Sequence, residues 1–199
     1  LANMHFDIKV FRSRVKTINE NNQVINWYPS SPTFETSLDY MYQKLCGFRR
    51  QTISEFFYCT DYIKKLGGFV NMPCAWTADF LSVLYFSQER GIISTQNILV
   101  NYRCSKKNIS SSHTDAVTKF NALLLFRKKI NGYISSLEQQ NQQNLLKDAL
   151  YLAMFSEIVG LCSATSLINI CRIFIKGGFP RKWILFIIVN KIGSFGKHK

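Results

Sequence analysis

The sequence lacks several patterns that mark common classes of protein. It has no Cys-x-x-Cys pair and no cysteine–histidine set with zinc spacing, which excludes the usual structural zinc sites. It also has no Asp-x-Asp and no glycine-rich phosphate loop, so no element for a nucleotide or its metal ion is recognisable. The uninterrupted apolar run from Trp183 to Val189 falls far short of the roughly 20 residues that span a bilayer.

Acidic residues are scarce, with 12 Asp and Glu against 25 Lys and Arg, a net charge of +13. From Ser166 onward there are seven basic residues and no acidic one. This asymmetry favours an anionic partner, either a membrane surface or nucleic acid. No base-reading or RNA-binding motif accompanies the charge, so nucleic acid is the weaker alternative. The segment "RKWILFIIVNK" mixes Trp, aliphatics and flanking cations as interfacial segments do, but a buried element with solvated ends is the better single explanation.

The six cysteines lie mostly among apolar neighbours, as in "EFFYCTDY" and "LINICRIF". A free cysteine in such a setting behaves as a small hydrophobe. We therefore expect reduced, structural cysteines and a cytosolic chain, in which disulfides are rare.

Hydrophobic periodicity predicts a mixed α/β fold over residues 1–112. The opening alternates as a β-hairpin interrupted by "NENN". A helix ending at Gly47 follows, then a short strand in "ISEFFYC" and a short helix capped by Thr60. A third helix, with Thr77 as its N-cap, precedes a strand over residues 92–103.

Residues 113–199 are expected to form a helical extension with a basic, amphipathic tail. Ser112 and Asp115 form a capping-box-like start to a helix that we expect to stop at Gly132. The apolar stripe of "NLLKDALYLAMFSEIVGLC" is wide enough to predict a helix packed on both sides. A further helix in "TSLINICRIFIKGG" ends on glycine.

An ordered block of short motifs runs from Phe56 to Ser112 and resembles family 2 glycosyltransferases, in particular the bacterial enzymes that build cell-surface polysaccharides. The matching elements are Gly67-Gly68-Phe69, Trp76-Thr77-Ala78-Asp79, Gly91-Ile92, Tyr102-Arg103, Ser105 and Asn108-Ile109-Ser110. The block covers roughly a quarter of the chain. Each motif alone is weak, but the ordered set at these spacings is fairly specific.

This resemblance implies that the chain is the C-terminal, acceptor-side portion of an inverting transferase with a GT-A-like sheet. The intact enzyme would take a nucleotide-sugar donor and a glycan or lipid-linked acceptor. Its Asp-x-Asp element, with Mg²⁺ or Mn²⁺, would lie just before Leu1. We therefore expect this chain to bind no cofactor and to be inactive alone, and the parent to be cytoplasmic, peripheral on the inner face of the membrane.

Asp79 is the candidate catalytic base. It is the only acidic residue between Asp61 and Glu89, and it falls at the second position of the helix that Thr77 starts. Exposed backbone N–H groups at a helix start favour an ionised carboxylate, which can accept a proton from an attacking sugar hydroxyl. Spacing alone favours the simpler explanation, in which Asp79 complements the helix dipole; the resemblance favours catalysis.

The resemblance also indicates substrate-binding roles for Trp76, Arg103, Ser105 and Asn108. Arg103 would neutralise the diphosphate of the donor, although an exposed basic strand end explains it as well. Many family members carry histidine where this chain has Ser105, which puts a histidine contact in doubt. Trp76 would stack on an acceptor sugar, with a place in the core as the simpler interpretation.

Overall fold

The computed structural model describes residues 7–105, 116–163, 166–180, 182–187 and 189. The fold is mixed α/β, as the sequence predicts. The chain divides into two compact units, 1–112 and 113–199, and this division falls at the boundary expected from the sequence.

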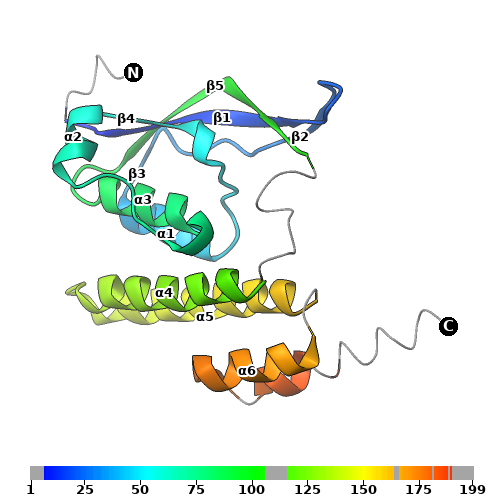
Figure 1. Cartoon of the computed structure of the whole chain (residues 1–199). Helices are drawn as coiled ribbons and strands as arrows, with labels where there is room; N and C mark the ends of the chain where they lie inside the picture. Colours follow the sequence, from blue (N-terminus) through cyan, green and yellow to red (C-terminus); the bar gives the residue numbers. More distant parts are fainter. Residues whose placement is uncertain (1–6, 106–115, 164–165, 181, 188, 190–199) are drawn as a thin grey trace. The chain divides into compact units, whose positions relative to one another are not determined.

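The first unit is built around a five-stranded mixed sheet (Figure 1). Its central strand, β1, pairs in parallel with β5 along one side. On its other side, β1 pairs antiparallel with β4 near its start and with β2 near its end. The strands are β1 (Val10–Ile18), β2 (Val24–Trp27), β3 (Phe34–Glu35), β4 (Phe56–Tyr58) and β5 (Ile92–Arg103).

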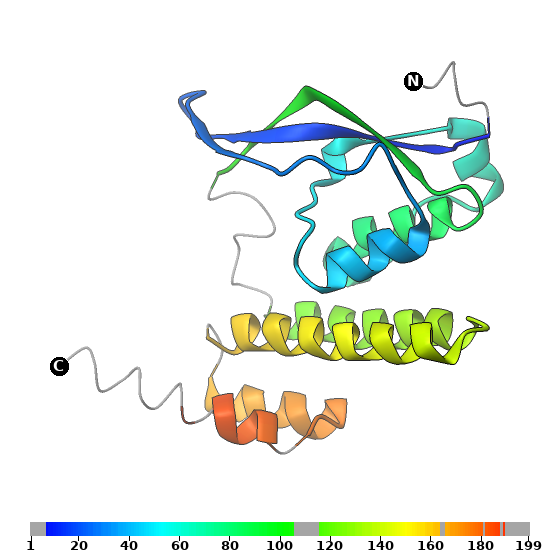
Figure 2. The ribbon, with the colours of Figure 1, turned by 180° about the vertical axis from the view of Figure 1, so that it is seen from behind.

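Two helices, α1 (Ser37–Leu45) and α3 (Ala78–Ser87), lie on one face of this sheet (Figures 1 and 2). Tyr40 of α1 and Phe80 of α3 meet edge to face, with ring centroids 5.6 Å apart. Both residues are buried, so the two helices share one apolar core beneath the sheet. The short helix α2 (Thr60–Lys65) follows β4.

The prediction that Thr77 is the N-cap of α3 is confirmed, although its side chain makes no capping hydrogen bond. Two other local predictions for this unit were wrong in detail. Thr60 begins α2 instead of capping it, because Cys59 occupies the N-cap position. The start of the predicted strand in "ISEFFYC" is a 3-10 turn, Ile53–Glu55, because the Glu55 carboxylate turns back to accept from the Thr52 N–H at 3.2 Å.

The second unit is helical. Its elements are α4 (Ala116–Ser135), α5 (Gln140–Ser163), α6 (Leu167–Gly177) and a helical segment over residues 182–187. The expected stop at Gly132 was wrong, since α4 runs through it to Ser135. Ile130 and Ile134 are fully buried on either side of Gly132, and their burial outweighs the cost of one helical glycine, about 1 kcal/mol. The predicted start at Ser112 and Asp115, like His113 between them, lies outside the described residues.

The apolar stripe of α5 is buried along one side by Leu146, Leu150 and Met154. A second side contacts the segment over residues 182–187, where the rings of Tyr151 and Phe155 lie 4.6 Å and 5.0 Å from that of Trp183. The predicted packing of this helix on two sides is thus confirmed, although Leu145 and Leu152 are exposed. The predicted glycine stop of α6 is confirmed, because Gly178 adopts the left-handed conformation there.

Candidate functional site

Asp79 lies at the second position of α3, where the sequence places it. The loop that delivers it to this position has an unusual backbone, since Cys74, Ala75 and Thr77 all have left-handed φ angles, of 46°, 55° and 64°. Residues other than glycine rarely adopt this conformation, which costs of order 1–3 kcal/mol each and clusters at functional sites. The chain therefore holds a strained turn directly before the candidate base.

The carboxylate of Asp79 is half-buried, and its Oδ1 accepts a hydrogen bond from the Phe80 N–H at 2.8 Å. Two tyrosines of the core lie within its electrostatic reach. Burial raises the pKa of Tyr58, and the negative charge of Asp79 raises it further. Burial also raises the pKa of Tyr40, with Asp79 again contributing. Both phenols thus stay protonated beside this carboxylate.

The side chain of Tyr58 lies on the buried side of this region. Within the described part of the chain, its buried hydroxyl has no hydrogen-bond partner. Its ring contacts Phe69 and Phe86 edge to face, with centroids 5.5 Å and 5.6 Å away. Phe69 follows Gly67 and Gly68, whose φ angles of 84° and 89° reverse the chain after α2. The Gly-Gly-Phe motif therefore packs against the tyrosine that lies near Asp79.

Trp76 precedes Asp79 by three residues and is half-buried. Its backbone carbonyl accepts a hydrogen bond from the Thr77 hydroxyl at 2.5 Å. Trp76, Asp79 and the Gly-Gly-Phe motif thus belong to one neighbourhood of the first unit, which is built by α3 and the loop before it.

Arg103 lies elsewhere. Its guanidinium donates to the backbone carbonyls of Asn19 and Glu20, at 2.8 Å and 3.1 Å, and to Asn22 Oδ1 at 2.7 Å. These bonds fasten the end of β5 to the β1–β2 turn. In the sheet, Arg103 pairs with Ile18, whereas Tyr58 pairs with Val10 at the other end of β1.

Val10 and Ile18 are eight residue steps apart along β1, roughly 26 Å at the usual rise. The structure therefore does not bring Arg103 to the Tyr58 end of the sheet, where the charge of Asp79 contributes to the raised pKa of Tyr58. Ser105 is the second residue after the end of β5. Asn108 lies outside the described residues.

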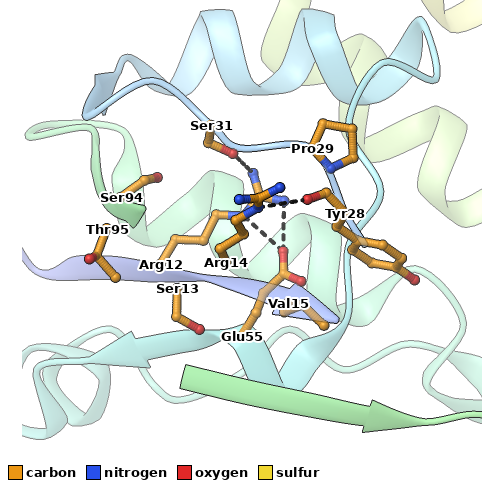
Figure 3. A pocket seen from close by; sticks show the side chains of 10 residues that line it. All are labelled: Arg12, Ser13, Arg14, Val15, Tyr28, Pro29, Ser31, Glu55, Ser94 and Thr95. Atoms are coloured by element: carbon orange, nitrogen blue, oxygen red, sulfur yellow. Dashed lines mark hydrogen bonds and ion pairs between the residues drawn. The ribbon is translucent and has the colours of Figure 1, made fainter. Parts of the chain in front are cut away.

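A buried ion-pair cluster that was not predicted from the sequence surrounds Arg12 of β1 (Figure 3). The Arg12 Nε donates to Glu55 Oε1 at 2.8 Å, and its other nitrogens donate to Ser31 Oγ at 2.6 Å and to the Arg50 carbonyl at 2.8 Å. Glu35 lies 3.7 Å from Arg12 Nη1. Its second oxygen is 3.6 Å from Arg49 Nε. Two arginines thus neutralise two carboxylates.

Burial raises the pKa of both Glu35 and Glu55, and the neighbouring arginines partly offset this. The hollow beside Arg12 has a volume of only about 10 Å³, which suits one water molecule and no sugar. We interpret the cluster as structural, because it joins β1, β3 and the 3-10 turn. A charged residue between the apolar Val10 and Val15 of a strand is the signal that could have revealed it.

The described residues hold no group of three or more His, Cys, Asp or Glu side chains suited to a metal ion. They therefore do not fit the Mg²⁺ or Mn²⁺ that the family resemblance implies for residues before Leu1. Four cysteines, Cys46, Cys59, Cys74 and Cys104, are free. In the part of the chain that is described, no helix has the length and apolarity needed to cross a membrane.

The chain's architecture is that of a mixed α/β unit followed by a helical one. No protein-family model, curated protein or solved structure matches it significantly.

Proposed function

We propose that this chain is the acceptor-side, base-bearing portion of an inverting nucleotide-sugar glycosyltransferase, in which Asp79 is the general base. The observation that carries the proposal is the placement of Asp79. Within the five positions before it, three residues other than glycine have left-handed φ angles. Such backbone strain persists only where the surrounding structure enforces it. The resemblance of the motifs around Asp79 to family 2 supplies the reaction class.

In the proposed reaction, a hydroxyl of the acceptor attacks the anomeric carbon of the donor sugar. The new C–O bond forms as the bond to the nucleoside diphosphate breaks, and the leaving group takes the bonding electrons. Asp79 takes the hydroxyl proton. Its position at a helix start suits this role, because the N–H groups of the first turn stabilise the ionised carboxylate that is ready to accept the proton.

The acceptor would lie over the α3 end of the first unit. Trp76 lies three residues before Asp79 and is half-buried, and rings of this kind stack on the apolar faces of sugars. Arg103 is held by the β1–β2 turn, so a contact with the donor phosphates would have to be made at that end of the sheet. The nucleotide and metal site is proposed to lie on residues that precede this segment in a longer enzyme.

A first test is the sequence encoded upstream of Leu1. The proposal expects a strand followed by Asp-x-Asp there, and an in-frame stop codon would contradict it.

The second test compares Asp79→Asn with Asp61→Asn in that longer enzyme. The two are matched, because Asp61 is also the second residue of its helix, α2. Loss of a general base lowers turnover by about 10²–10⁴-fold, so Asp79→Asn should nearly abolish release of nucleoside diphosphate from a panel of nucleotide-sugars. Asp61→Asn should retain it, and circular dichroism should show both variants folded. Full turnover by Asp79→Asn would refute the assignment.

A further inference from the structure

The helical segment over residues 182–187, together with Val189, has two sharply different sides. Trp183 and Ile187 are 4% and 5% exposed. Leu185, Phe186 and Val189 are 66%, 50% and 68% exposed. With the exposed Lys182, these three follow the spacing i, i+3, i+4 and i+7, so they form one stripe along a helix. We call residues 182, 185, 186 and 189 the outer stripe.

The inner side of the segment is firmly attached to α5. The Trp183 Nε1 donates to the Tyr151 hydroxyl at 2.5 Å. The ring of Trp183 lies 5.0 Å from that of Phe155. Phe186 of the outer stripe lies at the edge of this contact, with its ring 5.4 Å from the same phenylalanine. Because these contacts fix the rotation of the helix, the outer stripe cannot turn its apolar side chains inward without breaking them.

The part of the sequence that carries the outer stripe has charges of one sign only, whereas α5 beside it carries the exposed Asp148 and Glu157. Residues 166–199 contain seven Lys and Arg and no Asp or Glu. Of these, Arg172 is exposed on α6, and Lys182 is exposed within the stripe itself. A second copy of the chain would bring like charges together at this face, which opposes self-association. Nucleic acid would satisfy the cations but would not cover the exposed leucine, phenylalanine and valine.

An anionic lipid surface would both attract the cations and cover the exposed apolar side chains of the outer stripe. Its headgroups attract cations at about 1 kcal/mol for each Lys or Arg near the surface, and its acyl boundary accepts an apolar helix face that lies in the plane of the interface. We propose that the outer stripe docks this protein on the surface of an anionic bilayer, with Leu185 and Val189 inserted at the acyl boundary. The proposal does not depend on glycosyl transfer.

Co-sedimentation of the full chain with phosphatidylcholine vesicles, with and without phosphatidylglycerol, tests this. The chain should bind the anionic vesicles, bind them less in high salt, and bind neutral vesicles poorly. Leu185→Glu and Val189→Glu should each weaken binding by roughly tenfold, because each loses an inserted side chain and adds a repelled charge. The matched control is Leu99→Glu on β5, where the leucine is 62% exposed; its binding should change by less than about twofold.

Circular dichroism and thermal melts establish that the variants fold. Equal losses for Leu99→Glu and Leu185→Glu would overturn the proposal, since the effect would then be one of net charge. Equal binding to neutral vesicles would also overturn it. So would salt-sensitive binding to duplex DNA without binding to anionic vesicles, which would indicate a nucleic-acid surface instead.

Discussion

At the scale of single residues, Arg12 is the counter-charge that two buried carboxylates of the first unit share. Its guanidinium is buried with the Glu55 carboxylate and lies 3.7 Å from Glu35. Taking such charges out of water costs several kcal/mol per ion, and mutual attraction and good hydrogen bonds are needed to offset that cost. Arg12 meets this requirement for Glu55, whereas neither oxygen of Glu35 has a hydrogen-bond partner among the described residues. The buried charge of Glu35 is therefore stabilised by its electrostatic attraction to Arg12 and Arg49.

Removing Arg12 should accordingly be far more damaging than removing a neighbouring arginine. Arg12→Ala leaves two buried carboxylates without their shared counter-charge, and we expect the free energy of unfolding to fall by about 3–5 kcal/mol. Arg14→Ala on the same strand removes a hydrogen bond to the Tyr28 carbonyl, worth about 1 kcal/mol. Urea unfolding of both variants measures the difference. Similar losses for the two would show that the ion pairs contribute little.

At the scale of elements, the turn before α3 has a conformation that its residues do not favour. Cys74, Ala75 and Thr77 have no intrinsic preference for the left-handed region, so the fold must impose it. Contacts on either side supply the constraint, since the Val70 N–H donates to Ser82 Oγ at 2.9 Å and Phe80 is buried against Tyr40. The start of α3, with Asp79 on it, is thereby held in one place.

Ala75→Gly tests this strain directly. The left-handed conformation costs an L-residue about 1–2 kcal/mol, and glycine adopts it freely, although it loses more entropy on folding. We expect a net gain of about 0.5–1 kcal/mol in the free energy of unfolding, measured in urea. Ala78→Gly, at the first helical position of α3, serves as the control and should lower stability by up to about 1 kcal/mol. A loss for Ala75→Gly equal to that of Ala78→Gly would show that the turn is unstrained.

At the scale of the whole molecule, local sequence predicted the elements better than the site. Strand β5 begins at Ile92 and ends at Arg103, as predicted from its β-favouring residues, and the helix start at Thr77 placed Asp79 correctly. The Arg12 cluster joins residues from four separate segments, and no local pattern specifies such long-range pairs. The same holds for Arg103, whose place at the β1–β2 turn depends on the parallel pairing of β1 with β5.

The two units each have a buried core of their own, and matched substitutions can test whether these cores are independent. Ile92 on β5 and Ile130 on α4 are both fully buried, so Ile→Ala at either should cost about 2–5 kcal/mol. If the cores are independent, Ile92→Ala should speed hydrogen exchange of amides in residues 10–103 and spare α4 and α5. Ile130→Ala should do the reverse. Faster exchange throughout the chain in both variants would instead show that the two units unfold as one cooperative body.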